Sequence, residues 1–279
     1  GALFLKRATG SGINSWTPIF LANMLAAILF SFFLALGGRW PGAEYLWQPA
    51  VIALLYIGGQ SFILTAVSVG DVSVAAPVAS LKVVVVAILL TVIARQAPAT
   101  AIWLAAFLAA AGVFLINYFV PKHGRSNVIL TATLAFAAAC CFALFDVLVQ
   151  TFTPRWGTGH LAAISYWFVG VLSLGLLRMI NKPAVLRKKR WGSLLIGSAL
   201  VAIQASLLVY SVSTFGNAAS INVVYSLRGL WGVVFAWTLA EYFGGNELRA
   251  PRKTMVLRLA GASLLVAAVI ITIVGPESL

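Results

Sequence analysis

The sequence predicts an all-α polytopic membrane protein with nine complete transmembrane helices and the remnant of a first. The composition is the first observation: 62% of the 279 residues are hydrophobic and only 9% are charged, which is too apolar for a soluble surface. Apolar stretches of about 20 residues, the length that spans a bilayer, recur along the whole chain. The third observation is an internal repeat, which arranges the helices as two five-helix repeats of inverted topology.

Glycine, proline or charged residues separate the predicted spans. In chain order the spans are 16–36, 47–67, 73–94, 100–120, 129–152, 161–180, 193–215, 217–240 and 255–274. A short apolar stub precedes them and ends in Lys6 and Arg7. We interpret this stub as the end of a truncated first helix.

The repeat has a constant offset of 146 residues and needs no gap where its polar and glycine residues match. Ser68, Gly70, Asp71, Ser80, Leu81 and Lys82 face Thr214, Gly216, Asn217, Ser226, Leu227 and Arg228. The matches predict a first repeat over 1–124, with its first helix truncated, and a second over 125–279. Since five spans is an odd number, the second repeat enters the membrane from the opposite side, as in many transporters.

The basic residues are distributed unequally between the two sides of the predicted membrane. Fourteen lie on one side, Arg39, Arg95 and Arg155 lie on the other, and Lys82 and Arg228 lie inside spans. The positive-inside rule makes the richer side cytoplasmic and places the C-terminus outside. We expect an integral membrane protein of the bacterial inner (cell) membrane. The net charge of +13 is then a topology signal and does not indicate nucleic-acid binding.

Three ionisable residues, Lys82, Arg228 and Asp146, lie within spans, where charge is costly and usually serves function. Lys82 and Arg228 lie about halfway along equivalent helices, so a pseudo-two-fold axis would bring them to opposite sides of one cavity. Arginine and lysine are the donors that a carboxylate or phosphate requires. The alternative is that each cation snorkels to an interface or is neutralised by a protein carboxylate. Their central depth disfavours snorkelling, and Asp146 can neutralise only one of them.

Asp146 has three interpretations that the sequence leaves open: a proton site for coupling, a counter-ion to Lys82 or Arg228, or a solvated residue near a helix end. Pro77 lacks the N–H that would bond the carbonyl of Ser73, so we expect the helix to bend or loosen there. Further candidates for substrate binding are Tyr225, Asn222, Gln60, Gln204 and Tyr56.

Signals for catalysis are weak. The two histidines lie in predicted loops, and the two cysteines, Cys140 and Cys141, are adjacent in an apolar run. Metal-ligand spacing, paired carboxylates within a span and a glycine-rich phosphate loop are all absent from the sequence. We therefore expect no enzyme activity, no cofactor and no metal.

The segments at 68–82 and 217–240 resemble the drug/metabolite transporter superfamily, in particular its EamA-type members. The resemblance lies in the five-plus-five duplication, the tight link at 69–73, the Ala75-Ala76-Pro77 segment with Lys82, and the segment 225–231. It implies a ten-helix fold in which cations on the fourth and ninth spans bind a substrate anion, as in the sugar-phosphate branches. Lys82 and Arg228 occupy those places. The C-terminus outside departs from the family, which usually keeps both termini in the cytoplasm.

The sequence thus predicts a secondary transporter that moves a small polar metabolite, anionic or zwitterionic, by alternating access. One alternative is proton-coupled efflux of cationic or apolar drugs, which two central positive charges disfavour. The other is a polytopic membrane enzyme acting on lipid-linked substrates. The expected partners are a small-molecule substrate and membrane lipid, not nucleic acid, with a homodimer left open.

Overall fold

The computed structural model describes residues 14–70, 72–95, 98–117, 127–180, 191–231, 234 and 252–275. All regular structure in these ranges is helical, with no β-strand. By length and composition, seven helical segments can cross a membrane, and an eighth apolar helix at 100–116 is shorter. The chain is therefore an integral membrane protein. The N-terminal stub and most of the predicted span 217–240 beyond Trp231 lie outside the described residues.

The helices follow the predicted spans closely. Those that correspond to single predicted spans are α2 (Trp16–Ser31), α3 (Trp47–Val69), α6 (Thr100–Asn117), α7 (Val128–Trp156), α8 (Thr158–Ser173), α10 (Trp191–Phe215) and α14 (Arg252–Val274). Short 3₁₀ segments, η1 (Phe32–Leu36) and η3 (Leu174–Met179), extend α2 and α8, and η2 (Ala43–Tyr45) precedes α3. The predicted span 73–94 is divided into α4 (Val72–Ser80) and α5 (Lys82–Val92), and the span that starts at Asn217 begins with α11 (Ala218–Ser226).

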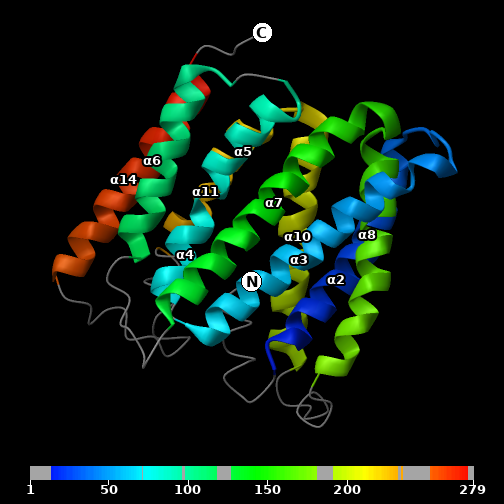
Figure 1. Cartoon of the computed structure of the whole chain (residues 1–279), viewed down its shortest axis with the longest axis horizontal. Helices are drawn as coiled ribbons and strands as arrows, with labels where there is room; N and C mark the ends of the chain where they lie inside the picture. Colours follow the sequence, from blue (N-terminus) through cyan, green and yellow to red (C-terminus); the bar gives the residue numbers. More distant parts are fainter. Residues whose placement is uncertain are drawn as a thin grey trace. The chain divides into compact units, whose positions relative to one another are not determined.

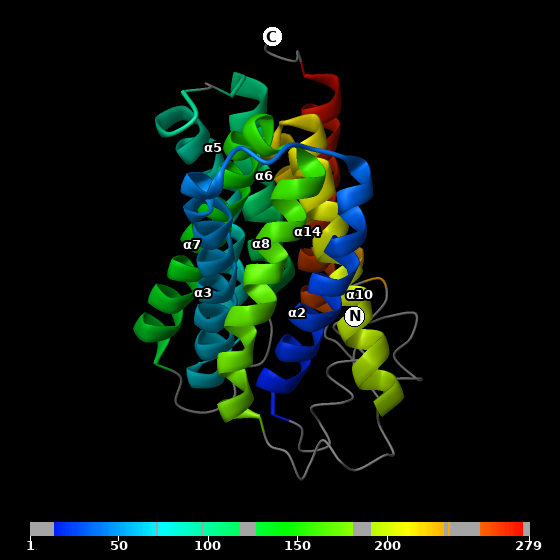
Figure 2. The same ribbon diagram turned by 90° about the vertical axis from the view of Figure 1, so that its right-hand side faces the viewer.

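The chain forms two compact units, and each takes segments from both predicted repeats. Unit 1 comprises Gly1–Ile57 and Leu148–Gly216, and unit 2 comprises Gly58–Val147 and Asn217–Leu279. In unit 1, α2 packs against α8 and α10 (Figure 2). The Phe30 and Tyr166 rings stack with centroids 3.7 Å apart, and the buried Asn23 amide donates to Ser173. Apolar packing and buried polar contacts thus hold this unit together.

Unit 2 is organised around the close contact of α6 and α14, which lie side by side (Figure 1). Gly112 and Gly261 face each other where these helices approach: a Cβ at Gly112 would lie 2.7 Å from the Gly261 carbonyl oxygen, and the reverse contact would be 2.6 Å. The core beside this contact includes Leu265, Ala109 and Val223. Small residues therefore allow α6 and α14 to pack backbone to backbone.

Two helices of unit 2 are interrupted at equivalent positions. The interruptions fall at Leu81, between α4 and α5, and at Leu227, after α11, and these residues are 146 apart. In each, the backbone N–H bonds the carbonyl three residues earlier, that of Val78 or Val224. Figure 1 shows α5 and α11 running in opposite directions. The 146-residue offset thus holds in the backbone as well as in the sequence.

The helix interruption does not fall where the proline predicts it. α4 continues through Pro77 and ends at Ser80. The Ser80 hydroxyl donates to the Pro77 carbonyl, which the Leu81 N–H would bond in a regular helix. Ser226 makes the same bond to Val223, where no proline is present. The serine is thus the feature that both interruptions share, and the expectation of a loosened helix at Pro77 is corrected to a break one turn later.

Candidate functional site

An ion pair between the half-buried Lys82 and the buried Asp146 forms the centre of the site. Lys82 is the first residue of α5, just after the interruption at Leu81, and Asp146 lies in the interior of α7. The Lys82 Nζ lies 2.7 Å from Asp146 Oδ2, and the two side chains are 13% and 1% exposed. The structure thus places Asp146 as the counter-ion of Lys82, and its burial is inconsistent with a solvated position near a helix end.

Asn222 on α11 joins the same carboxylate. Its Nδ2 donates to Asp146 Oδ2 at 2.7 Å and to the Ala218 carbonyl at 2.8 Å. The Asp146 oxygen therefore receives donors from two helices, α5 and α11. The second oxygen of Asp146 and the Asn222 Oδ1 are buried and have no hydrogen-bond donor among the described residues. Two buried acceptors at one site can receive a donor group from a ligand or from water.

Tyr225 brings the two predicted cations to one place. The Lys82 Nζ lies 5.6 Å from the centroid of the Tyr225 ring, and the Arg228 guanidinium carbon lies 4.5 Å from it. The Arg228 Nη1 also donates to the Tyr225 hydroxyl at 2.7 Å. A single aromatic ring thus has both cations within the range of cation–π attraction. The sequence named Tyr225 as a candidate for substrate binding, but it did not indicate that the ring lies near Lys82 as well as Arg228.

The charges at this site do not balance. Asp146 is paired with Lys82, and the part of the chain that the structure describes places no carboxylate within ion-pair distance of Arg228. Arg228 is exposed, and its guanidinium contacts Tyr225. The group of Lys82, Asp146 and Arg228 therefore carries one net positive charge, and that charge lies on the guanidinium. A planar guanidinium is suited to bidentate binding of a carboxylate or phosphate.

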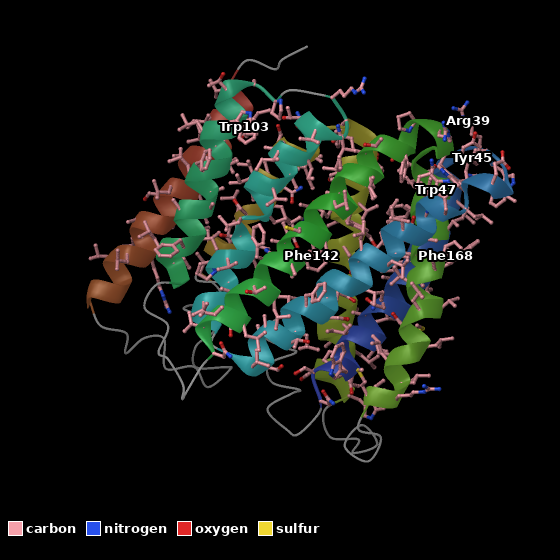
Figure 3. All side chains as sticks on the ribbon, in the orientation of Figure 1. Arg39, Tyr45, Trp47, Trp103, Phe142 and Phe168 are labelled. Carbon is pink, nitrogen blue, oxygen red and sulfur yellow. The ribbon has the colours of Figure 1, made fainter. Side chains whose placement is uncertain are left out.

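Phe142 is a neighbour of the site that the sequence did not single out. It lies on α7, one helical turn before Asp146, and its ring centroid is 5.9 Å from the Lys82 Nζ (Figure 3). A Cβ at Gly59 of α3 would lie 2.8 Å from this ring. The spacing of Phe142 and Asp146 on one helix face was visible in the sequence. Its contact with Gly59 joins residues 83 positions apart and could not be read from local patterns.

The contacts described above do not include the remaining predicted residues. Gln60 is half-buried on α3 in unit 2. In unit 1, Tyr56 is half-buried with its ring centroid 5.3 Å from that of Tyr166, and Gln204 is exposed on α10. Pro77 provides the carbonyl that Ser80 bonds. The contacts described above therefore join five predicted residues: Lys82, Asp146, Asn222, Tyr225 and Arg228.

Comparisons with known proteins test the resemblance to the EamA-type transporters. The model of the EamA-like transporter family matches residues 1–118, which lie within the predicted first repeat. This match confirms the resemblance to the EamA-type drug/metabolite transporters over that part of the chain, and the long apolar helices are consistent with it.

Solved structures extend the likeness of fold over the whole chain. One, described only as a crystal structure of a protein, aligns with 98% of this chain and 96% of its own, with a TM-score of 0.66 and 16% sequence identity. In all, 28 solved chains match. The search of curated proteins returned no match. At this identity the likeness concerns the fold alone, so a substrate has to be argued from the residues of this chain.

Proposed function

We propose that this protein is a secondary transporter of small polar metabolites that carry an anionic group, either as anions or as zwitterions. The observation that carries the proposal is the charge imbalance at Tyr225: two cations lie beside one ring, and Asp146 pairs with only one of them. Arg228 is then the primary contact for the substrate anion. Lys82, held by Asp146, contributes a second donor when the ion pair opens.

The proposed mechanism is alternating access between two inverted repeats. It is supported by the matching interruptions at Leu81 and Leu227, each directly before a cation of the site. Discontinuous helices at related positions in two halves often mark the binding site of a transporter. A rearrangement at these positions would change the orientation of Lys82 and Arg228, so binding and access would be coupled. Asp146 remains the coupling candidate because it holds Lys82 on α5 and Asn222 on α11.

Efflux of cationic drugs is the second candidate, and the same geometry disfavours it. The uncompensated charge at Arg228 repels a cation. Aromatic rings at Tyr225 and Phe142 could contact a drug, but both already lie near the Lys82 ammonium. A membrane enzyme would need a polar group positioned for acid or base chemistry. The described contacts of Asp146 are those of a counter-ion.

A thermal-shift screen of the purified protein tests the proposal. The probes are organic acids, sugar phosphates, amino acids and cationic dyes, applied to the wild type and to Arg228→Gln. We expect anions or zwitterions to raise the Tm of the wild type by about 2–4 °C, which corresponds to about 1 kcal/mol of binding stabilisation. Arg228→Gln should abolish this rise. Stabilisation by dyes alone, unchanged in the variant, would refute the proposal.

The control is Arg95→Gln, which removes an exposed cation elsewhere in unit 2. It should retain the full response to anions. The same proteins reconstituted in liposomes should show uptake of the stabilising anion in the wild type and in Arg95→Gln. Arg228→Lys keeps the charge without the planar fork, so it should retain weaker binding.

A further inference from the structure

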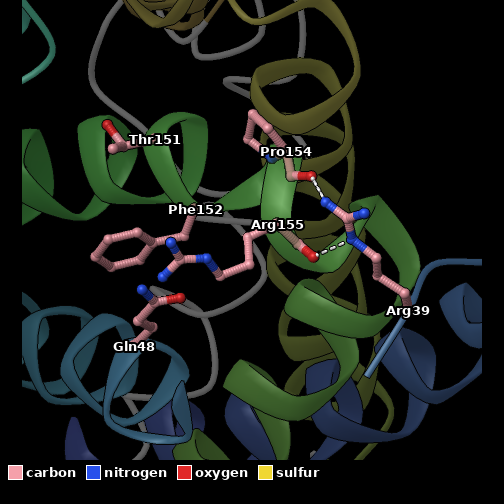
Figure 4. Close-up of a pocket in the computed structure, with 6 residues that line it drawn as sticks. All are labelled: Arg39, Gln48, Thr151, Phe152, Pro154 and Arg155. Atoms are coloured by element: carbon pink, nitrogen blue, oxygen red, sulfur yellow. Dashed lines mark hydrogen bonds between the residues drawn. The ribbon is translucent and has the colours of Figure 1, made fainter. Parts of the chain in front are cut away.

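A cavity in unit 1 lies at the carboxyl end of α7. It has a volume of about 380 Å³, and the residues that line it are Arg39, Gln48, Thr151, Phe152, Pro154 and Arg155 (Figure 4). The lining contains two arginines and an amide but no carboxylate. The transport proposal assigns no role to this cavity, so its charges require a separate explanation.

Arg39 has a structural role at the cavity wall. Its Nε donates to the Arg155 carbonyl at 2.7 Å, and its Nη2 donates to the Pro154 carbonyl at 3.0 Å. Its backbone N–H donates to the Trp156 carbonyl at 2.8 Å. These carbonyls belong to the last turn of α7, where a helix leaves acceptors unpaired and favours a cation. Arg39 therefore fixes the end of the helix that carries Arg155.

Gln48 is held so that its amide nitrogen faces the cavity. The buried Trp156 Nε1 donates to Gln48 Oε1 at 2.8 Å, which assigns the oxygen and the nitrogen of the amide. Gln48 is only 3% exposed. Figure 4 shows its nitrogen directed toward the Arg155 guanidinium. The NH₂ group is thus on the side of the amide away from Trp156, and the cavity wall presents a donor at this position.

The Arg155 guanidinium faces the same space. Its carbon lies 4.3 Å from the centroid of the Tyr45 ring, which orients the planar group, and no carboxylate of the described chain lies within ion-pair distance. Two donor groups, one of them charged, therefore face one cavity that has no anionic acceptor in its lining. Such an arrangement is stabilised when an oxyanion accepts hydrogen bonds from both.

We propose that this cavity binds an oxyanion, specifically a phosphate group. Its surroundings indicate the source: Trp40 and Trp47 are both more than half exposed and pack against Trp156 and Phe152, beside the cavity. Figure 3 shows Arg39, Tyr45 and Trp47 gathered at the same end of unit 1. Exposed tryptophans at a helix end mark the depth of lipid headgroups. The phosphate of a lipid headgroup therefore lies at the depth of the cavity. A free phosphate carries the same oxyanion.

Two substitutions test the proposal. Gln48→Glu keeps the acceptor for Trp156 but replaces the NH₂ group with a carboxylate oxygen beside Arg155, so an internal ion pair occupies the anion site. Arg155→Gln removes the charge. Arg95→Gln is the matched control, since it removes one exposed arginine at the end of α5 in unit 2. The probes are inorganic phosphate, chloride at equal ionic strength, and mixed micelles of phosphatidylglycerol in a phosphate-free detergent.

We expect phosphatidylglycerol to raise the Tm of the wild type and of Arg95→Gln by about 2–4 °C. Gln48→Glu and Arg155→Gln should lose at least half of this rise, and Gln48→Glu should itself be no less stable than the wild type. If inorganic phosphate gives the same rise, the site takes the free anion, and if only the lipid does, it takes the headgroup. Equal responses of all four proteins, or no response beyond that to chloride, would overturn the proposal.

Discussion

The hydroxyl groups of Ser80 and Ser226, which are 146 residues apart, each bond the backbone carbonyl three residues earlier and end a helix one residue before a leucine. In a regular helix, the N–H of the following leucine would donate to the carbonyl that each serine binds. That N–H turns instead to the carbonyl of Val78 or Val224. Lys82 and Arg228 follow directly after these two leucines, so we expect the two serines to influence the direction of the two cations.

Replacing Ser226 with alanine should restore the regular helix and weaken substrate binding. The fold should change little, by about 0.5 kcal/mol or less, because serine bonds to the preceding turn slightly destabilise a helix. Uptake of the anion in liposomes should fall several-fold because Arg228 is redirected. Ser211→Ala is the control, since Ser211 bonds the Leu207 carbonyl within the continuous helix α10. If both variants transport equally well, the serine does not position Arg228.

The comparison of serine with proline shows what the sequence could predict. The offset of 146 identified the equivalent positions, and the residue pattern placed the helices within a few residues. The sequence assigned the interruption to Pro77, because proline lacks an N–H. The second helix breaks in the same way after Ser226, although the residue equivalent to Pro77 is Val223. A serine in a helix has several hydrogen-bond choices, and only the coordinates show which one it takes.

Asp146 illustrates a second limit of prediction from the sequence. Its place in an apolar span predicted a functional or paired residue, and the sequence left three interpretations open. The choice depends on which side chains of α5 and α11 reach the carboxylate, and those contacts join residues 64 and 76 positions away. Local periodicity does not contain this information. The pairing of charges also decides which cation is left for a ligand.

Asp146→Asn should destabilise the protein by about 3 kcal/mol, because it leaves the largely desolvated Lys82 ammonium without its counter-ion. Thermal unfolding in detergent measures the effect. The double variant Lys82→Met with Asp146→Leu should regain at least half of the loss, since replacing both charges removes the need for pairing. A single variant as stable as the wild type would show that the pair contributes nothing to the fold.

The same Asp146→Asn variant should prefer dianions. With the carboxylate removed, the net charge of Lys82, Asp146 and Arg228 rises from one to two. Binding of a sugar phosphate relative to a monocarboxylate should increase about tenfold, which corresponds to about 1.4 kcal/mol. The ratio of the two affinities, measured by thermal shift at several concentrations, is independent of a uniform loss of stability. An unchanged ratio would mean that Lys82 does not face the substrate.

Tyr225→Phe should separate the contribution of the Tyr225 hydroxyl to anion binding from that of its ring. The variant keeps the ring beside both cations but removes the acceptor of the Arg228 hydrogen bond. One such bond contributes about 1 kcal/mol, so binding of the anion should weaken about fivefold. Tyr225→Leu should weaken it further because it also removes both ring contacts. Tyr210→Phe, in unit 1, is the control and should bind as the wild type does.

Gly112→Ala should destabilise unit 2 without changing substrate selectivity. The new Cβ would lie 2.7 Å from the Gly261 carbonyl oxygen and 3.0 Å from the Leu265 side chain, so α6 and α14 would have to move apart. Overpacking of this kind costs about 1–3 kcal/mol, and the Tm should fall accordingly. Gly192→Ala in α10, where a Cβ meets nothing within 4 Å, should leave the Tm unchanged or raise it because alanine favours helix. Equal Tm values for the two variants would show that α6 and α14 do not require this close approach.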